Sequence, residues 1–242
     1  MRKGLVVDLD GSLMNTNTFQ KYIVFIIKEA ALVCRFDIVI TLFYWATLRK
    51  CRCITHEKMK YHILVKTCFF MNSQRLELFV DWLMNDINVS VRNILEAKKE
   101  QGYYICLSTA APENYVRIIS ERLGFDGFCA SSVPVDKEGD WYENVRDMKK
   151  NKTLNFLKDR DIKISVLMTD HYDDLPLLCE NKDYNYLVNP SLKTLKSCRM
   201  AGVSFELLIS KYNDPPIMIG LKNREGIICR RIIRNNNLIT FV

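Results

Sequence analysis

Four short apolar runs along this chain each end in polar side chains, as buried strands do when they deliver residues to one edge of a sheet. The runs cover residues 5–7, 103–107, 164–168 and 186–188. Stretches with a helical spacing of apolar residues separate the last three runs. Such alternation predicts an α/β fold with a Rossmann-like, doubly wound parallel sheet.

Residues 15–88 interrupt this alternation, because they contain neither glycine nor proline and have a helical pattern. Thr55 and Asn72 are residue types that cap the starts of helices. We expect residues 1–14 and 89–202 to form the core and residues 15–88 to form an inserted α-helical cap. Residues 203–242 would be a C-terminal extension of unknown role, with short strands at 217–219, 227–229 and 238–241.

The first apolar run leads into candidate chemistry. Asp8 and Asp10 follow it, and Gly11 lets the chain turn sharply after them. Ligands of open α/β sheets bind at the carboxyl edge of the strands. Two carboxylates there suit a nucleophile beside a proton donor, with a hard cation between them. An acidic turn after a strand explains the same residues equally well when they are taken alone.

Three further motifs follow in an order that, with residues 8–13, resembles the haloacid dehalogenase superfamily. They are Ser108-Thr109, Lys152, and residues 170–176. The resemblance spans about residues 3–200 and is greatest to the phosphoserine-phosphatase-like subgroup, whose helical cap lies between the first and second motifs. It implies a phosphatase that hydrolyses a phosphate monoester with Mg²⁺ through an aspartyl-phosphate intermediate.

The resemblance also implies roles for individual residues. Asp8 is the nucleophile, and Asp10 is the general acid and then the general base. Thr109 and the backbone amide of Ala110 bind the phosphoryl group, with Ser108 as the close alternative to Thr109.

A lysine is expected to place its positive charge on the phosphoryl group. Lys152 is preferred to Lys149 and Lys150, because apolar residues follow Lys152 at helical spacing and would put it at a helix start.

The expected Mg²⁺ ligands are all aspartates. Asp170 binds directly, and Asp174 returns to the same point after about one helical turn. The metal set is completed by Asp8 and by Asp10, which contributes its backbone carbonyl. The chain departs from the family pattern at Thr169 and His171, and the roles of His171 and Asp173 stay open.

Composition and net charge bear on the compartment and the partners of the protein more than on its chemistry. The nine cysteines are scattered and odd in number, which favours free thiols in a reducing cytoplasm, and no signal peptide is apparent. The formal net charge of +7 suits either a solvated basic surface or the steering of anionic substrates or lipid headgroups. No nucleic-acid motif accompanies it, so we expect no nucleic-acid partner. The oligomeric state cannot be inferred from the sequence.

Three other functions fit the same sequence. The apolar cap suits a lipid or prenyl phosphate substrate at a membrane surface, although no apolar run reaches the ~20 residues that span a bilayer. A phosphotransferase would use the same aspartates with another acceptor in place of water. A non-catalytic binding module ranks last, because every expected catalytic side chain is present.

Overall fold

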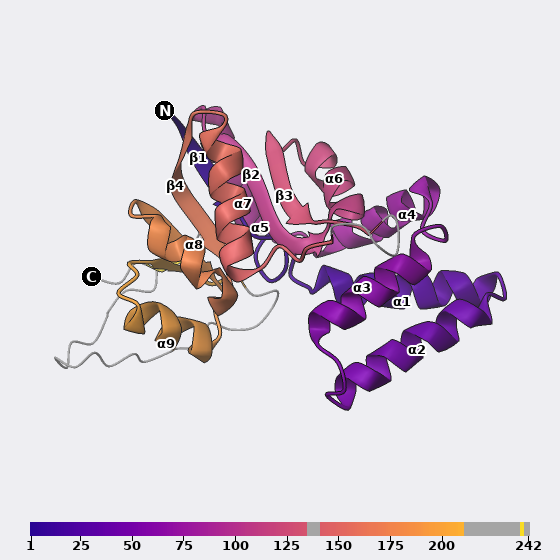
Figure 1. Ribbon diagram of the computed structural model, residues 1–242. Helices are drawn as coiled ribbons and strands as arrows, with labels where there is room; N and C mark the ends of the chain where they lie inside the picture. Colours follow the sequence, from indigo (N-terminus) through magenta and orange to yellow (C-terminus); the bar gives the residue numbers. More distant parts are fainter. Residues whose placement is uncertain (135–140, 211–237, 240–242) are drawn as a thin grey trace.

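The computed structural model describes residues 1–134, 141–210 and 238–239. Its described strands form one sheet in the order β3-β2-β1-β4-β5-β6-β7 (Figure 1). Strands β1 to β6 are parallel, and β7 is antiparallel to β6. The strands are β1 (Arg2–Val7), β2 (Tyr104–Pro112), β3 (Gly127–Ser131), β4 (Ile162–Thr169), β5 (Tyr184–Val188), β6 (Glu206–Leu208) and β7 (Leu238–Ile239). The predicted α/β class and the Rossmann-like parallel sheet are confirmed.

Helices cover both faces of this sheet, because successive side chains of a strand point to opposite faces. Leu5 and Val7 pack into a core with α5 and α6, whereas Val6 packs with α7, α8 and α9 on the other face. The helices outside the cap are α5 (Val89–Glu100), α6 (Glu113–Arg122), α7 (Arg146–Lys158), η2 (Tyr172–Asp174), α8 (Leu175–Glu180) and α9 (Leu192–Met200).

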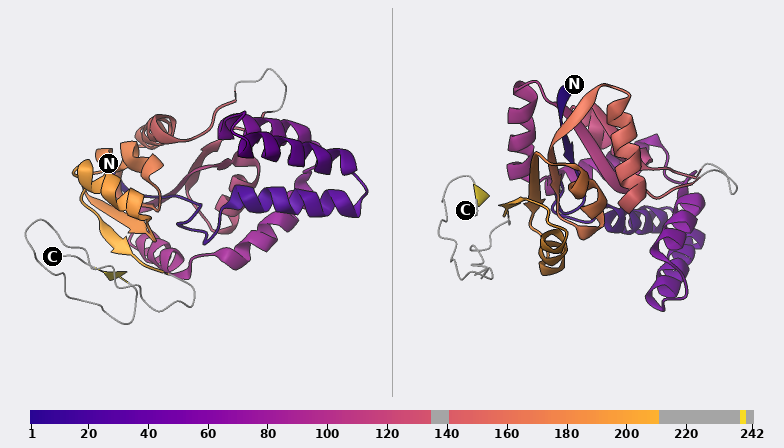
Figure 2. Two further views of the ribbon diagram at one scale, coloured as in Figure 1. Left: turned by 90° about the horizontal axis from the view of Figure 1, so that it is seen from below. Right: turned by 60° about the vertical axis from the view of Figure 1, so that its left-hand side comes forward.

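The segment predicted as the cap holds a group of helices beside the sheet. They are α1 (Thr18–Leu32), α2 (Phe36–Lys50), α3 (His56–Thr67), α4 (Ser73–Leu83) and the short η1 (Met84–Asp86). Thr55 and Asn72 cap α3 and α4, their side chains accepting hydrogen bonds from the backbone of Lys58 and Arg75, so both predicted helix starts are confirmed. The right-hand view of Figure 2 shows α2 and α3 projecting together from the body of the molecule.

The sheet continues beyond the predicted end of the core. Strand β6 lies within residues 203–242 and pairs with β5, so this part of the expected extension belongs to the sheet. Of the three short strands expected there, only residues 238–239 fall within the described chain, where they form β7. The segments 217–219 and 227–229 lie outside the described residues. None of the described helices is both long and apolar enough to cross a membrane.

Candidate active site

Asp8 and Asp10 lie just beyond the carboxyl end of β1. The Asp8 backbone N–H continues the strand pairing by donating to the Met168 carbonyl at 2.9 Å. Asp10 Oδ1 accepts from the backbone N–H of Thr18 at 2.7 Å, which ties this carboxylate to the first residue of cap helix α1. Burial raises the pKa of Asp10, against the lowering effect of the Thr18 hydrogen bond.

Gly11 makes the turn that brings this pair against a third carboxylate. Its φ is +72°, in the left-handed region that glycine adopts without strain. A Cβ at this position would clash with the carboxylate of Asp170, so the backbone of the turn touches that side chain. The turn predicted after Asp10 therefore requires glycine at position 11 for two reasons: the positive φ, and the absence of a Cβ that would strike Asp170.

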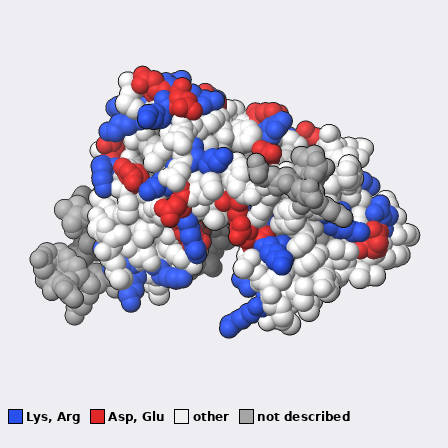
Figure 3. Space-filling model, in the orientation of Figure 1, with Lys and Arg blue, Asp and Glu red and all other residues white. Residues whose placement is uncertain are grey.

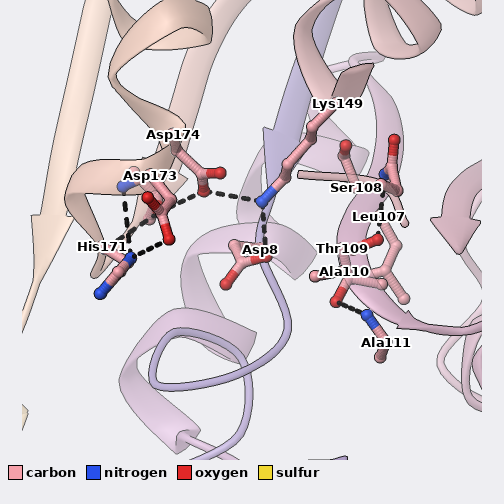
Figure 4. Close-up of polar contacts among 12 residues, drawn as sticks. Asp8, Leu107, Ser108, Thr109, Ala110, Ala111, Lys149, His171, Asp173 and Asp174 are labelled. Atoms are coloured by element: carbon pink, nitrogen blue, oxygen red, sulfur yellow. Dashed lines mark hydrogen bonds and ion pairs between the residues drawn. The ribbon is translucent and has the colours of Figure 1, made fainter. Parts of the chain in front are cut away.

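Lys149 lies between Asp8 and Asp174 (Figure 4). Its Nζ donates to Asp8 Oδ1 and to Asp174 Oδ2, each at 2.7 Å, and all three side chains are buried. Burial alone would lower the pKa of Lys149, but Asp174 and Asp8 outweigh burial and hold the pKa above its usual value. Asp8 keeps a pKa well above normal, because burial outweighs the attraction of Lys149.

The preference for Lys152 over Lys149 is corrected by this geometry. Lys152 is exposed, with its Nζ 4.3 Å from the centre of the Tyr142 ring. Helix α7 begins at Arg146, so Lys149 falls in its first turn and Lys152 in its interior. The buried stripe of α7 is Lys149, Thr153 and Leu157, so a lysine takes the place of the first apolar residue.

Asp174 and Asp170 occupy different surroundings. Asp174 Oδ2 accepts from Lys149 and also from Thr169 Oγ1 at 2.6 Å, so this oxygen serves the lysine and not an open ligand position. Asp170 lines the cavity next to Gly11, and burial raises its pKa to about 7, with the charge of Asp174 as a further cause. Both aspartates line the cavity, so the metal role stays a prediction for each of them, and Asp174 is in addition placed to orient Lys149.

Of the predicted phosphate-binding residues on β2, two line the cavity and one is bonded inside the protein. Thr109 lines the cavity, and its Oγ1 accepts from the Ala111 N–H at 3.0 Å, which leaves the hydroxyl hydrogen available to a ligand. Ala110 lines the cavity beside it. Ser108 instead pairs its hydroxyl with Thr153 at 2.7 Å inside the protein, so Thr109 is the better placed of the two.

Residues that the sequence did not suggest hold this end of β2 in place. Lys60 of cap helix α3 donates to the Ala110 carbonyl at 2.5 Å and to Glu143 Oε1 at 2.8 Å. Asn144 donates through Nδ2 to the Thr109 carbonyl at 3.0 Å. Both side chains are buried, and no motif marks them, because their partners are backbone carbonyls distant in sequence.

His171 and Asp173, whose roles the sequence left open, lie at the rim. The His171 side chain is 45% exposed, and its Nδ1 accepts from the Asp173 backbone N–H at 3.2 Å. Asp173 forms an ion pair with Arg146 at 2.9 Å. Both residues line the cavity, where His171 bonds within the turn around η2 and Asp173 links this turn to the start of α7.

The cavity that these residues share has a volume of about 440 Å³. Its described lining is polar apart from Gly11, Ala110 and Val145. Only Asn15, Thr16 and Asn17, just before α1, come from the segment predicted as the cap. Among the described residues, the apolar core of the cap therefore does not line the cavity.

The charge around this cavity fits a bound cation. Asp8, Asp10 and Asp170 line it, while the buried Lys149 is already shared between Asp8 and Asp174. Within the described chain, no three His, Cys, Asp or Glu side chains are gathered closely enough to hold a metal by themselves. Mg²⁺ suits such a partial set, because it keeps several waters and binds through one or two carboxylates plus substrate phosphate.

Comparison with known proteins gives a family and a fold. A family model for haloacid dehalogenase-like hydrolases matches residues 5–178. A protein of unknown function from Bordetella pertussis Tohama I superposes with a TM-score of 0.66 at 17% identity, over 85% of this chain and 98% of its own. A phosphoserine phosphatase, as a phospho-aspartyl intermediate analogue, gives 0.54 at 16% identity, over 87% of this chain and 95% of its own.

A probable phosphoserine phosphatase from Vibrio cholerae has a TM-score of 0.60 at 13% identity, over 81% of this chain and 59% of that one. At these identities the likeness to solved structures shows a shared fold. No curated protein is similar enough to this sequence to count as a match.

Proposed function

This chain belongs to the haloacid dehalogenase-like hydrolases, and from that premise we propose that it is a phosphatase acting through a phosphorylated Asp8. The observation that carries the proposal is the pairing of Lys149 with Asp8 inside a cavity that Asp10 and Thr109 also line. A carboxylate beside a buried cation, with a second carboxyl group close by, is equipped for nucleophilic attack and proton transfer.

The first step would transfer the phosphoryl group to the enzyme. An oxygen of Asp8 attacks phosphorus, and the bond between phosphorus and the ester oxygen breaks. Asp10 gives its proton to the departing oxygen, which leaves as an alcohol. The raised pKa of Asp10 supports this role, because a carboxyl group must hold its proton to act as an acid.

The second step would restore the enzyme. Asp10, now a carboxylate, accepts a proton from water as that water attacks phosphorus. The bond from phosphorus to Asp8 breaks, inorganic phosphate leaves, and Asp10 regains its proton. The hydrogen bond from the Thr18 backbone to Asp10 Oδ1 leaves the other carboxyl oxygen for this exchange.

Positive and hydrogen-bonding groups would hold the phosphoryl oxygens during both steps. Thr109 offers its hydroxyl hydrogen and Ala110 its backbone N–H, while Lys149 supplies charge next to Asp8. Such preorganised donors stabilise the transition state most when they are shielded from water, as Thr109 and Lys149 are.

Mg²⁺ would be held by the carboxylates of Asp8 and Asp170 and by the backbone carbonyl of Asp10. Bound there, it would offset the repulsion between these carboxylates and an anionic substrate. We test this separately from catalysis by thermal unfolding. Mg²⁺ should raise the melting temperature of the wild type and of an Asp173→Asn control, but not that of Asp170→Asn. An equal rise in all three proteins would remove Asp170 from the metal site.

The polar lining of the cavity favours a small, polar phosphate monoester as substrate. Val145 is the only aliphatic side chain larger than alanine in the described lining. A lipid or prenyl phosphate would have to leave its chain outside this cavity. Transfer to an acceptor other than water uses the same residues, so products formed with added alcohols would distinguish a phosphotransferase from a phosphatase.

The function is tested by phosphate release from p-nitrophenyl phosphate. We expect release with Mg²⁺, none with EDTA, and none from Asp8→Asn. An exposed carboxylate away from the cavity, Asp159, gives the matched control variant Asp159→Asn, which should behave as wild type. Full activity in Asp8→Asn would contradict the proposal. Absence of release by the wild type across a panel of phosphate monoesters would favour the binding module.

A further inference from the structure

The outward face of helix α2 is apolar. Its side chains at the outer positions keep more than half of their surface exposed: Phe36 56%, Ile40 68%, Phe43 58% and Tyr44 56%. Their spacing of four, three and one residues places them on one side of the helix. Ile38 and Leu42 occupy the opposite side and are buried. We call the four exposed residues the α2 outer face.

This face lies where a flat partner could reach it. In Figure 2 the α2–α3 pair projects from the body of the molecule, and in Figure 3 the cap helices present a broad uncharged area with Lys and Arg at its lower edge. Leu32 and Val33, at the turn before α2, are also exposed, at 79% and 49%. Clustered exposure of this kind marks an interaction surface, whereas single exposed apolar residues need no explanation.

Three cations stand at the carboxyl end of α2. Arg49, Lys50 and Arg52 are exposed, and none of them pairs with an acidic side chain among the described residues. The cations at the other end differ, since Arg35 and Lys66 both pair with Asp37. The charge that α2 leaves unmatched is therefore positive and confined to one end.

We propose that the α2 outer face docks this protein onto an anionic lipid bilayer, with Arg49, Lys50 and Arg52 on the headgroups. An anionic bilayer offers an apolar layer bordered by negative headgroups, and α2 offers apolar side chains on one face with unmatched cations at one end. The helix has 15 residues, so it lies in the surface and does not cross it.

A second copy of this chain matches the same surface less well. Two α2 outer faces packed together would bring their unpaired cations against each other or against Asp37, whose carboxylate is already shared by Arg35 and Lys66. Like charges without partners oppose such a contact. The proposal is independent of the phosphatase chemistry, because no residue of the α2 outer face lines the active-site cavity.

The test is co-sedimentation of the whole chain with vesicles. Vesicles of phosphatidylcholine with about one-third phosphatidylglycerol should bind the wild type, and pure phosphatidylcholine vesicles should bind it far more weakly. The triple variant Arg49→Gln/Lys50→Gln/Arg52→Gln should lose roughly 100-fold in partitioning. The variant Ile40→Asp/Phe43→Asp should lose about as much.

Leu192→Asp is the matched control, because Leu192 is 73% exposed on α9, outside the proposed surface. It should bind vesicles as the wild type does, and circular dichroism should show all variants folded. The proposal is overturned if the wild type binds the phosphatidylglycerol-containing vesicles no better than pure phosphatidylcholine vesicles. It is also overturned if the α2 variants bind the phosphatidylglycerol-containing vesicles as well as the wild type does. A dimer in light scattering that Ile40→Asp/Phe43→Asp converts to a monomer would assign the face to a second copy instead.

Discussion

Lys149 Nζ lies 2.7 Å from Oδ1 of Asp8, although the two residues are 141 positions apart in the chain. The contact depends on the parallel sheet, which places the carboxyl end of β1 beside the first turn of α7. It also depends on Asp174, which accepts from the same Nζ at 2.7 Å and so fixes the lysine from the other side. Asp8 is thereby presented to the cavity next to a buried positive charge.

Replacing this lysine should remove activity. We expect Lys149→Met to lower kcat by about 10²–10³, because the phosphoryl group loses the charge beside it. The measurement is aryl phosphate turnover, corrected for folded fraction by circular dichroism, since the variant leaves buried carboxylates unpaired. Lys152→Met is the matched control three residues on and should keep wild-type kcat. The reverse result would restore Lys152 to the site.

The two neighbouring hydroxyls of β2 should differ in their effect on activity. Thr109→Val removes the donor facing the cavity and should lower kcat/KM roughly 100-fold. It should also cost about 1 kcal/mol in the free energy of unfolding, because the buried Ala111 N–H loses its acceptor. Ser108→Ala removes the buried bond to Thr153 and should cost about 1 kcal/mol in the free energy of unfolding while kcat stays near wild type. Urea titrations and kinetics on both variants check this, and an inactive but stable Ser108→Ala would contradict it.

Gly11 and Gly102 offer a matched pair of glycines. Both have positive φ, +72° and +80°, but a Cβ at Gly11 would strike Asp170, whereas nothing lies within 4 Å of one at Gly102. Gly102→Ala should cost only about 1–2 kcal/mol of backbone strain and keep full activity. Gly11→Ala should displace Asp170 and abolish the stabilisation by Mg²⁺. Melting temperatures with and without Mg²⁺ distinguish the two variants. Normal Mg²⁺ stabilisation of Gly11→Ala would contradict the claim that the close approach of Gly11 to Asp170 is needed for metal binding.

Glu143 should make the free energy of unfolding depend on pH in the acidic range. Burial would raise the pKa of Glu143, but His56 and Lys60 outweigh burial and bring it from 4.5 down to about 2. A carboxyl group with a lowered folded-state pKa stabilises the fold above its unfolded pKa, and that contribution fades as pH falls from about 4.5 toward about 2. Urea midpoints should therefore drop across this window more steeply for the wild type than for Glu143→Gln. Identical slopes would show that the contact with Lys60 contributes nothing.

The parts of the site that the sequence predicts are those set by local geometry. Asp8, Asp10 and Gly11 follow a short apolar run directly, so the strand, the carboxylates and the turn are all visible within one segment. The caps at Thr55 and Asn72 are equally local, because each side chain bonds to a backbone N–H three residues on. Such features need no knowledge of the rest of the fold.

The preference for Lys152 failed for a physical reason, which is the burial of Lys149. Helix α7 starts without a capping side chain at Val145, and its buried stripe begins with Lys149, so an apolar pattern could not locate its first turn. Asp174 looked like a metal ligand from its spacing, yet that spacing serves Lys149 and Thr169 equally well. Lys60 was invisible for a further reason, since its partner is the carbonyl of Ala110, fifty residues away.

The most direct test is a search for phosphate on Asp8. The Asp10→Asn variant, which lacks the group that activates water, should accumulate a phosphorylated enzyme after incubation with p-nitrophenyl phosphate and Mg²⁺. Mass spectrometry after acid quench should show one added phosphoryl group, mapped by reduction with borohydride to Asp8 and missing from Asp8→Asn/Asp10→Asn. Phosphate release by the wild type, with no covalent adduct on Asp8 in the wild type or in Asp10→Asn, would contradict the proposed mechanism.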